Sequence, residues 1–133
     1  MHNQEEVKID TNLYSRQIGT FGIETMGKLI KMKVLIVGLR GLGVETAKNL
    51  ILAGPASVTL YDPNPVTWGD LSSNFNCRPE HVGQVSRAAA SFDKLQELNP
   101  YVKVSVVDTL ALEDHVHYNV VCYTDIFESI DKL

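Results

Sequence analysis

Apolar residues along this chain show two different kinds of spacing, and the spacing predicts its secondary structure. A short run of consecutive apolar residues, typical of a strand covered on both faces of a parallel sheet, occurs at 33–37, and shorter apolar stretches predict further strands at 57–61, 102–107 and 119–124. Apolar residues at helical spacing predict helices at 14–30, 42–53 and 84–98. Helices and strands therefore alternate along the chain.

This alternation predicts an α/β fold, because a helix between two parallel strands makes a right-handed crossover. We expect an open, doubly wound, Rossmann-like sheet of mostly parallel strands. Prolines after Asp62 end the second strand, and a long connection continues to about Val82. The 133 residues make at most one domain, with a disordered tail at 1–12 and a folded part at 13–133. The last predicted strand lies close to Leu133, so we expect a truncated fragment of a larger protein.

The first strand runs into the glycine-rich turn Gly38-Leu39-Arg40-Gly41-Leu42-Gly43. In a dinucleotide-binding turn, the first glycine permits the reversal, the second lets the backbone approach a pyrophosphate, and the third lets the helix pack on the strand. Gly38 and Gly43 take the first and third places, whereas Arg40 takes the second. The turn therefore has the two glycines that the fold requires but lacks the glycine that would let the backbone approach a ligand. The alternative is that Arg40 is an ordinary exposed residue that points away from a working turn.

Composition narrows the classes of function. The formal net charge of −4 argues against nucleic acid or an anionic membrane as a partner. The polar start of the chain is neither a secretory signal nor a membrane anchor, so we expect an intracellular protein. Two cysteines and four histidines without ligand spacing predict no disulfide framework and no metal site.

Several spaced motifs together resemble one family. They are Tyr14-Ser15-Arg16-Gln17, the glycine turn continued to Glu45, Asp70-Leu71-Ser72-Ser73-Asn74-Phe75, and Leu98-Asn99-Pro100. This set closely resembles the amino-terminal part of ubiquitin-activating enzyme, of the ThiF/MoeB-like superfamily, over roughly Leu13 to Thr124. In that family two related adenylation halves pack together, and only one of them holds ATP. The chain resembles the start of the silent half, so residues 13–133 would be a partial inactive adenylation domain.

The resemblance also implies that the nucleotide-binding site of this half is no longer functional. Asp62 stands where active halves hold the ribose, and we interpret it as vestigial, together with Gly38, Arg40, Gly41 and Gly43. Asp70 and Ser73 stand where active halves carry a phosphate-binding asparagine and arginine, and Ser86 is the nearest match to a missing phosphate-binding lysine. Loss of a guanidinium removes a bidentate phosphate clamp, and an anionic Asp70 would repel a polyphosphate. We therefore expect no ATP in this half.

Arg16 is the one catalytic residue that the resemblance implies. In the family, the arginine of this motif reaches the ATP bound in the partner half. Attack of a carboxylate on the α-phosphate builds negative charge, which a guanidinium stabilises. The complete enzyme would bind ATP and Mg in its active half, use ubiquitin and ubiquitin-conjugating enzymes as partners, and work in the cytoplasm and nucleus.

Two alternatives remain open. One is a non-catalytic subunit of a SUMO- or NEDD-activating enzyme. The other is an NAD-dependent oxidoreductase, which the position of Asp62 favours, but Arg40 and the lack of a recognisable hydride-transfer acid or base disfavour it. Trp68 and Phe75 lie in the long connection, where we expect interface or core anchors rather than a platform for stacking a base.

Overall fold

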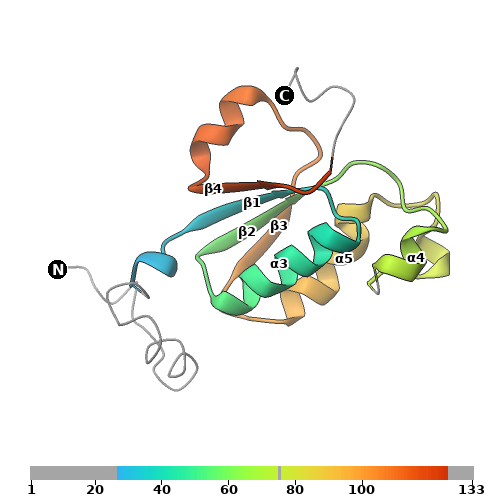
Figure 1. The fold of residues 1–133 in the computed structure, drawn as a ribbon, viewed down its shortest axis with the longest axis horizontal. Coiled ribbons are helices and arrows are strands. Elements are labelled where there is room, and N and C mark those ends of the chain that lie inside the picture. Colours follow the sequence, from blue (N-terminus) through green and yellow to red (C-terminus); the bar gives the residue numbers. More distant parts are fainter. Residues whose placement is uncertain (1–26, 75, 126–133) are drawn as a thin grey trace.

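The computed structural model describes residues 27–74 and 76–125, which form one parallel sheet with helices packed against it (Figure 1). Its strands are β1 (Lys33–Val37), β2 (Ser57–Tyr61), β3 (Lys103–Val106) and β4 (Val120–Tyr123). Their order is β3-β2-β1-β4, and every pairing is parallel. The predicted α/β, Rossmann-like class is confirmed, and in the described part all strands, rather than most, are parallel.

Two longer helices cover one face of this sheet (Figure 1). They are α3 (Gly41–Ala53), which connects β1 to β2, and α5 (Arg87–Glu97), which leads into β3. Three short helical elements were not predicted: α4 (Asp70–Ser73), η2 (Pro79–His81) and η3 (Leu112–His117). Of the predicted helix at 14–30, the part before residue 27 lies outside the described residues, as does the tail at 1–12, and residues 27–29 are helical.

α5 begins later than the pattern predicts. The Val66 N–H donates to the Val85 carbonyl at 3.0 Å. The residues around Val85 therefore pair with the connection that follows β2 instead of forming the first turn of the helix. The Ser86 hydroxyl then accepts from the Ala89 N–H at 3.1 Å and caps the helix. The predicted start near Gln84 was therefore wrong by about one turn, because long-range pairing prevails over local helical spacing.

The apolar run of β1 fills both sides of the sheet. Val34 and Ile36 pack with α3 and α5, whereas Leu35 and Val37 pack on the opposite face with Tyr61 and the β3–β4 connection. These four side chains are at most 1% exposed, whereas Lys33, the first residue of β1, is exposed. Burial of each contributes about 1.5–3 kcal/mol, which explains why the strand shows no polar alternation.

Candidate functional site

The glycine turn lies at the carboxyl end of β1, where ligands bind in open α/β sheets. Gly38 has φ of +102°, a conformation that favours glycine, and a Cβ there would lie 2.7 Å from Thr124 Oγ1. A Cβ on Gly43 would lie 1.8 Å from the Gly38 carbonyl oxygen, so only glycine lets α3 start this close to β1. Gly41 is less confined, with the Ser73 Cβ 3.0 Å from its own hypothetical Cβ. The first and third glycines are thus required by the fold itself.

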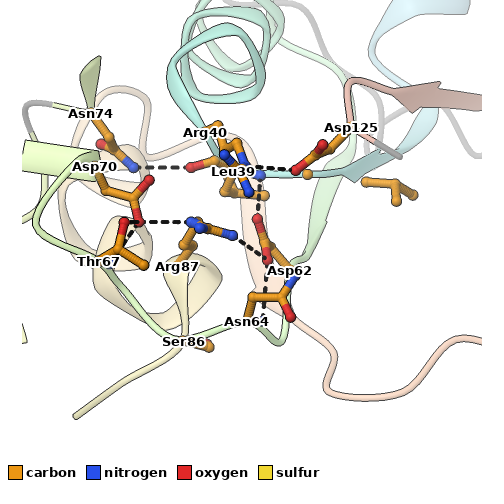
Figure 2. A network of polar contacts seen from close by, with 12 residues as sticks. Leu39, Arg40, Asp62, Asn64, Thr67, Asp70, Asn74, Ser86, Arg87 and Asp125 are labelled. Atoms are coloured by element: carbon orange, nitrogen blue, oxygen red, sulfur yellow. Dashed lines mark hydrogen bonds and ion pairs between the residues drawn. The ribbon is translucent and has the colours of Figure 1, made fainter. Parts of the chain in front are cut away.

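Arg40 adopts an extended backbone conformation that does not need glycine, with φ of −79° and ψ of −171°. Its Nε lies 2.9 Å from Asp125 Oδ2, and the two side chains are 58% and 22% exposed. Figure 2 shows this ion pair joining the turn to the segment that follows β4. An exposed pair of this kind contributes about 1 kcal/mol at most. Its side chain nevertheless lies across the carboxyl ends of β1 and β4.

Asp62 follows β2 directly, as predicted, but its carboxylate is fully buried beneath the turn. Oδ2 accepts from the Leu39 N–H at 2.8 Å, and Oδ1 accepts from the Asn64 N–H at 3.2 Å. Burial raises the pKa of Asp62, although the Leu39 N–H and the Arg87 guanidinium oppose this change. Both oxygens therefore bond to the protein's own groups.

Arg87 is the charged residue at this site that sequence analysis missed. It is 3% exposed, with Nε 2.7 Å from Asp70 Oδ2 and Nη1 3.6 Å from Asp62 Oδ1. Figure 2 shows the guanidinium between these two carboxylates. Within the described part of the chain, Nη1 makes no hydrogen bond. The available signal was its spacing of four from Ser91 and eight from Leu95, both buried on the same face of α5.

The expectation that Asp70 repels a polyphosphate needs correction. Asp70 is 4% exposed, and its Oδ2 accepts from the Thr67 N–H at 2.8 Å and the Thr67 hydroxyl at 3.1 Å, besides pairing with Arg87. Burial by itself raises its pKa, but the Thr67 N–H and the guanidinium outweigh burial, so the pKa lies below its usual value. The charge of Asp70 is real but is compensated inside the protein. Ser73, by contrast, is exposed.

The backbone of Leu39 is clamped from both sides. Its N–H donates to Asp62, and its carbonyl accepts from Asn74 Nδ2 at 3.1 Å. Asn74 is fully buried, and its Nδ2 also lies 3.0 Å from Ser91 Oγ. The connection between β2 and α5, together with α5 itself, therefore holds the backbone of the glycine turn through Asp62, Asn74 and Ser91.

Other predicted features are placed as follows. Arg16 and Phe75 lie outside the described residues. Trp68 is 67% exposed, so the expectation of a core anchor does not apply to it. In the described ranges, no group of three His, Cys, Asp or Glu side chains is arranged to hold a metal ion. In the same ranges, no helix is long and apolar enough to cross a membrane.

Cys77 is expected to be unreactive in the folded protein. It is 7% exposed, and burial, reinforced by the nearby Asp70 carboxylate, raises its pKa to about 11. Because the thiolate is the reactive form, alkylation at neutral pH should be slow until the chain unfolds. Mass spectrometry after iodoacetamide treatment, with and without guanidinium chloride, measures this. Equal labelling of Cys77 in both conditions would contradict the prediction.

Comparison with known proteins agrees with the motifs. "Ubiquitin-activating enzyme E1 2" of Arabidopsis thaliana is 50% identical over 133 residues, which are 98% of this chain and 12% of that protein. "Ubiquitin-like modifier-activating enzyme 1" of Dictyostelium discoideum is 52% identical over 80% of the chain, and that of Homo sapiens is 48% identical over 84%. The chain spans about a tenth of the length of each of these two relatives. The resemblance to ubiquitin-activating enzymes is therefore confirmed.

Solved structures agree on the fold. The Escherichia coli tRNA N6-threonylcarbamoyladenosine dehydratase TcdA, solved in complex with ATP, superposes with a TM-score of 0.72. The match covers 88% of this chain and 50% of that one at 20% identity, so it supports the fold alone. The model of the ThiF family matches residues 14–133. On this evidence the chain belongs to the ThiF family.

Proposed function

We propose that this chain is part of the silent adenylation half of an ATP-dependent ubiquitin-activating enzyme. The complete enzyme would adenylate the ubiquitin carboxyl terminus with ATP and Mg held by its active half, and would then form a thioester elsewhere in the polypeptide. Ubiquitin and ubiquitin-conjugating enzymes would be its partners, in the cytoplasm and nucleus. This half would brace the active one and donate Arg16 to its ATP. The relatives at about 50% identity support the enzyme class.

The observation that best supports the silent role is that the Asp62 carboxylate is already bonded inside the protein. A ribose ligand must present its carboxylate to the crevice at the carboxyl ends of the strands. Here the carboxylate is fully buried and bonds to Leu39 and Asn64, while Arg40 pairs with Asp125 above it. A nucleotide would have to break these contacts and find no second glycine. The same contacts disfavour the NAD-dependent oxidoreductase.

The first test is nucleotide binding by the chain itself. Isothermal titration with Mg-ATP, and separately with NAD, should give no saturable heat at millimolar ligand. The reason is that Asp62 bonds to the protein's own groups and Arg40 takes the place of the second glycine. TcdA, which has been solved with ATP, serves as the positive control. Stoichiometric binding of ATP would refute a silent half, and stoichiometric binding of NAD would favour the oxidoreductase.

Arg16→Ala is expected to slow adenylation. The test uses a chimaera, in which this chain replaces the matching segment of the Arabidopsis relative, and measures ATP–pyrophosphate exchange. Exchange should fall about 1,000-fold or more, as for other arginines supplied in trans. Thermal melting should be unchanged. Arg40→Ala is the matched control and should keep normal exchange, because Arg40 pairs within its own half. An unchanged exchange rate in Arg16→Ala would remove Arg16 from the mechanism.

A non-catalytic subunit of a SUMO- or NEDD-activating enzyme remains the alternative. The chimaera separates the two possibilities, because a chain that works in a single-chain ubiquitin enzyme should support exchange driven by ubiquitin. Exchange driven only by SUMO or NEDD, with the chain supplied as a separate subunit, would favour the alternative.

A further inference from the structure

We propose that the edge of the sheet at β3 is a strand-binding surface that the Gln96 side chain closes. Without this side chain, β3 pairs with the β3 edge of a second copy of the chain, so Gln96 keeps the chain from associating with itself. The inference does not depend on the proposed function, because every contact that supports it lies in β2, β3 and α5.

β3 leaves one side of its backbone without a neighbouring strand. Within the described residues it pairs with β2 only, at one end of the strand order. The Lys103 N–H donates to the Ala56 carbonyl at 3.2 Å, so the backbone groups of Lys103 face β2. Backbone groups of successive strand residues point to alternate sides. The groups of Val102, Val104 and Val106 therefore point away from β2, toward the open edge.

The Gln96 amide takes the place that a neighbouring strand would take. Gln96 lies one residue before the end of α5, and its Nε2 donates to the Val102 carbonyl at 2.9 Å. Its Oε1 accepts from the Val104 N–H at 3.0 Å. A residue of an added parallel strand would make the same two hydrogen bonds with its own N–H and carbonyl. Val102 and Val104 are accordingly only 1% and 4% exposed, although they lie along the edge of the sheet.

The segment beside Gln96 has the composition of a strand that pairs readily. Residues 102–107 are Val-Lys-Val-Ser-Val-Val, with four valines, one charge and no proline. Segments of high β-propensity and low charge pair with copies of themselves when they are exposed on an edge. An apolar groove of about 360 Å³ runs beside this segment, lined by Ala89 and Phe92 of α5 and by residues 104–106. The groove would bury side chains of an added strand.

A second copy of the chain is the partner that this edge fits, because the second copy carries the same edge. In a contact with two-fold symmetry the same surface lies on both sides, so the two β3 strands would pair antiparallel. Native proteins prevent such pairing by covering or charging the edge. The amide of Gln96 is suited to this purpose, because it satisfies one donor and one acceptor of the edge at once.

Hydrogen exchange in the wild-type chain tests whether the edge is closed. The Val104 N–H, which bonds to Gln96, should exchange at least about tenfold more slowly than the Val106 N–H, which faces the open side. Nuclear magnetic resonance resolves the two amides. Equal exchange rates at the two positions would overturn the closure.

Sedimentation equilibrium tests the pairing with a second copy. Gln96→Ala removes the amide and keeps high helix propensity in α5. Its self-association should be about tenfold stronger than in the wild type, because two backbone hydrogen-bonding groups become available. Gln96→Met, which lacks the amide but keeps the length of the side chain, replaces this variant if it does not fold. Gln84→Ala is the matched control, since Gln84 is exposed in a turn. Association of the Gln96 variant no stronger than that of the control would overturn the proposal.

Two further variants test whether the contact lies on the β3 edge. Gln96→Glu adds a charge to the edge and should stay as monomeric as the wild type. Val106→Pro, added to Gln96→Ala, removes an N–H on the open side and leaves the bonds to β2 intact, so it should abolish the gain in association. Unchanged association in this double variant would assign the contact to another surface and overturn the proposal. Equal association of Gln96→Glu and Gln96→Ala would attribute it to lost stability instead of an open edge, with the same consequence.

Discussion

Gly43→Ala should destabilise the protein by about 3 kcal/mol or more, as overpacking at a rigid backbone contact does. The added Cβ would lie 1.8 Å from the Gly38 carbonyl oxygen, which is a backbone atom and cannot move away as the end of a flexible side chain could. The gain in helix propensity on replacing glycine by alanine, about 1 kcal/mol, opposes this effect but is smaller. Urea unfolding followed by circular dichroism measures the difference in the free energy of unfolding.

Gly83→Ala is the matched control for this substitution. Gly83 has φ of +71°, but none of the described atoms lies within 4 Å of its hypothetical Cβ. Its replacement should therefore cost only the left-handed backbone strain of about 1–2 kcal/mol. If the two variants were equally stable, the close approach of α3 to β1 would not constrain position 43.

Arg87→Met should destabilise the protein by about 3–5 kcal/mol, because it removes the shared counter-ion and leaves two buried carboxylates unpaired. Arg40→Met removes an arginine whose side chain is 58% exposed, so its cost should stay below about 1 kcal/mol. Chemical unfolding of both variants at neutral pH gives the comparison. If Arg87→Met lowered the free energy of unfolding as little as Arg40→Met, water would have to reach the carboxylates of Asp62 and Asp70.

The cost of Arg87→Met should also depend on pH. In the wild type the pKa of Asp70 is lowered, so its contribution to stability is present above the unfolded pKa and is lost as the pH falls. Burial already raises the pKa of Asp62, and loss of the guanidinium should raise the pKa values of both Asp62 and Asp70, so the variant should lose stability relative to the wild type as the pH rises through the unfolded value, about 4. The stability difference should therefore shrink in acid. A difference that is constant between acid and neutral pH would contradict a charge mechanism.

Local pattern was sufficient for much of the fold. The bounds of β1 and β2 agree with the predicted runs, and α3 begins one residue before the prediction. Continuous apolar runs and glycine turns carry this information because strand burial and backbone reversal depend on neighbouring residues. α4 and η2 were missed because a single turn is too short to show a helical period.

The polar site was predictable only in part. Asp62 and the glycines were found from their order along the chain, and Gly38 and Gly43 have the geometry that their places require. Arg87 was missed in favour of Ser86, because a lone cation in a helix normally faces solvent. Its partner Asp70 lies 17 residues earlier, and nothing in the local pattern joins the two.

The sequence by itself determined the order of strands and helices, the glycines of the turn and the family, because these follow from residue type and spacing along the chain. Only the tertiary structure decided that the Asp62 carboxylate turns inward, that the charge of Asp70 is paired with Arg87 and that Trp68 is exposed. The physical reason is that burial and pairing of charges depend on which distant residues the crossovers bring together. Those contacts set the cost of desolvation, which residue order does not reveal.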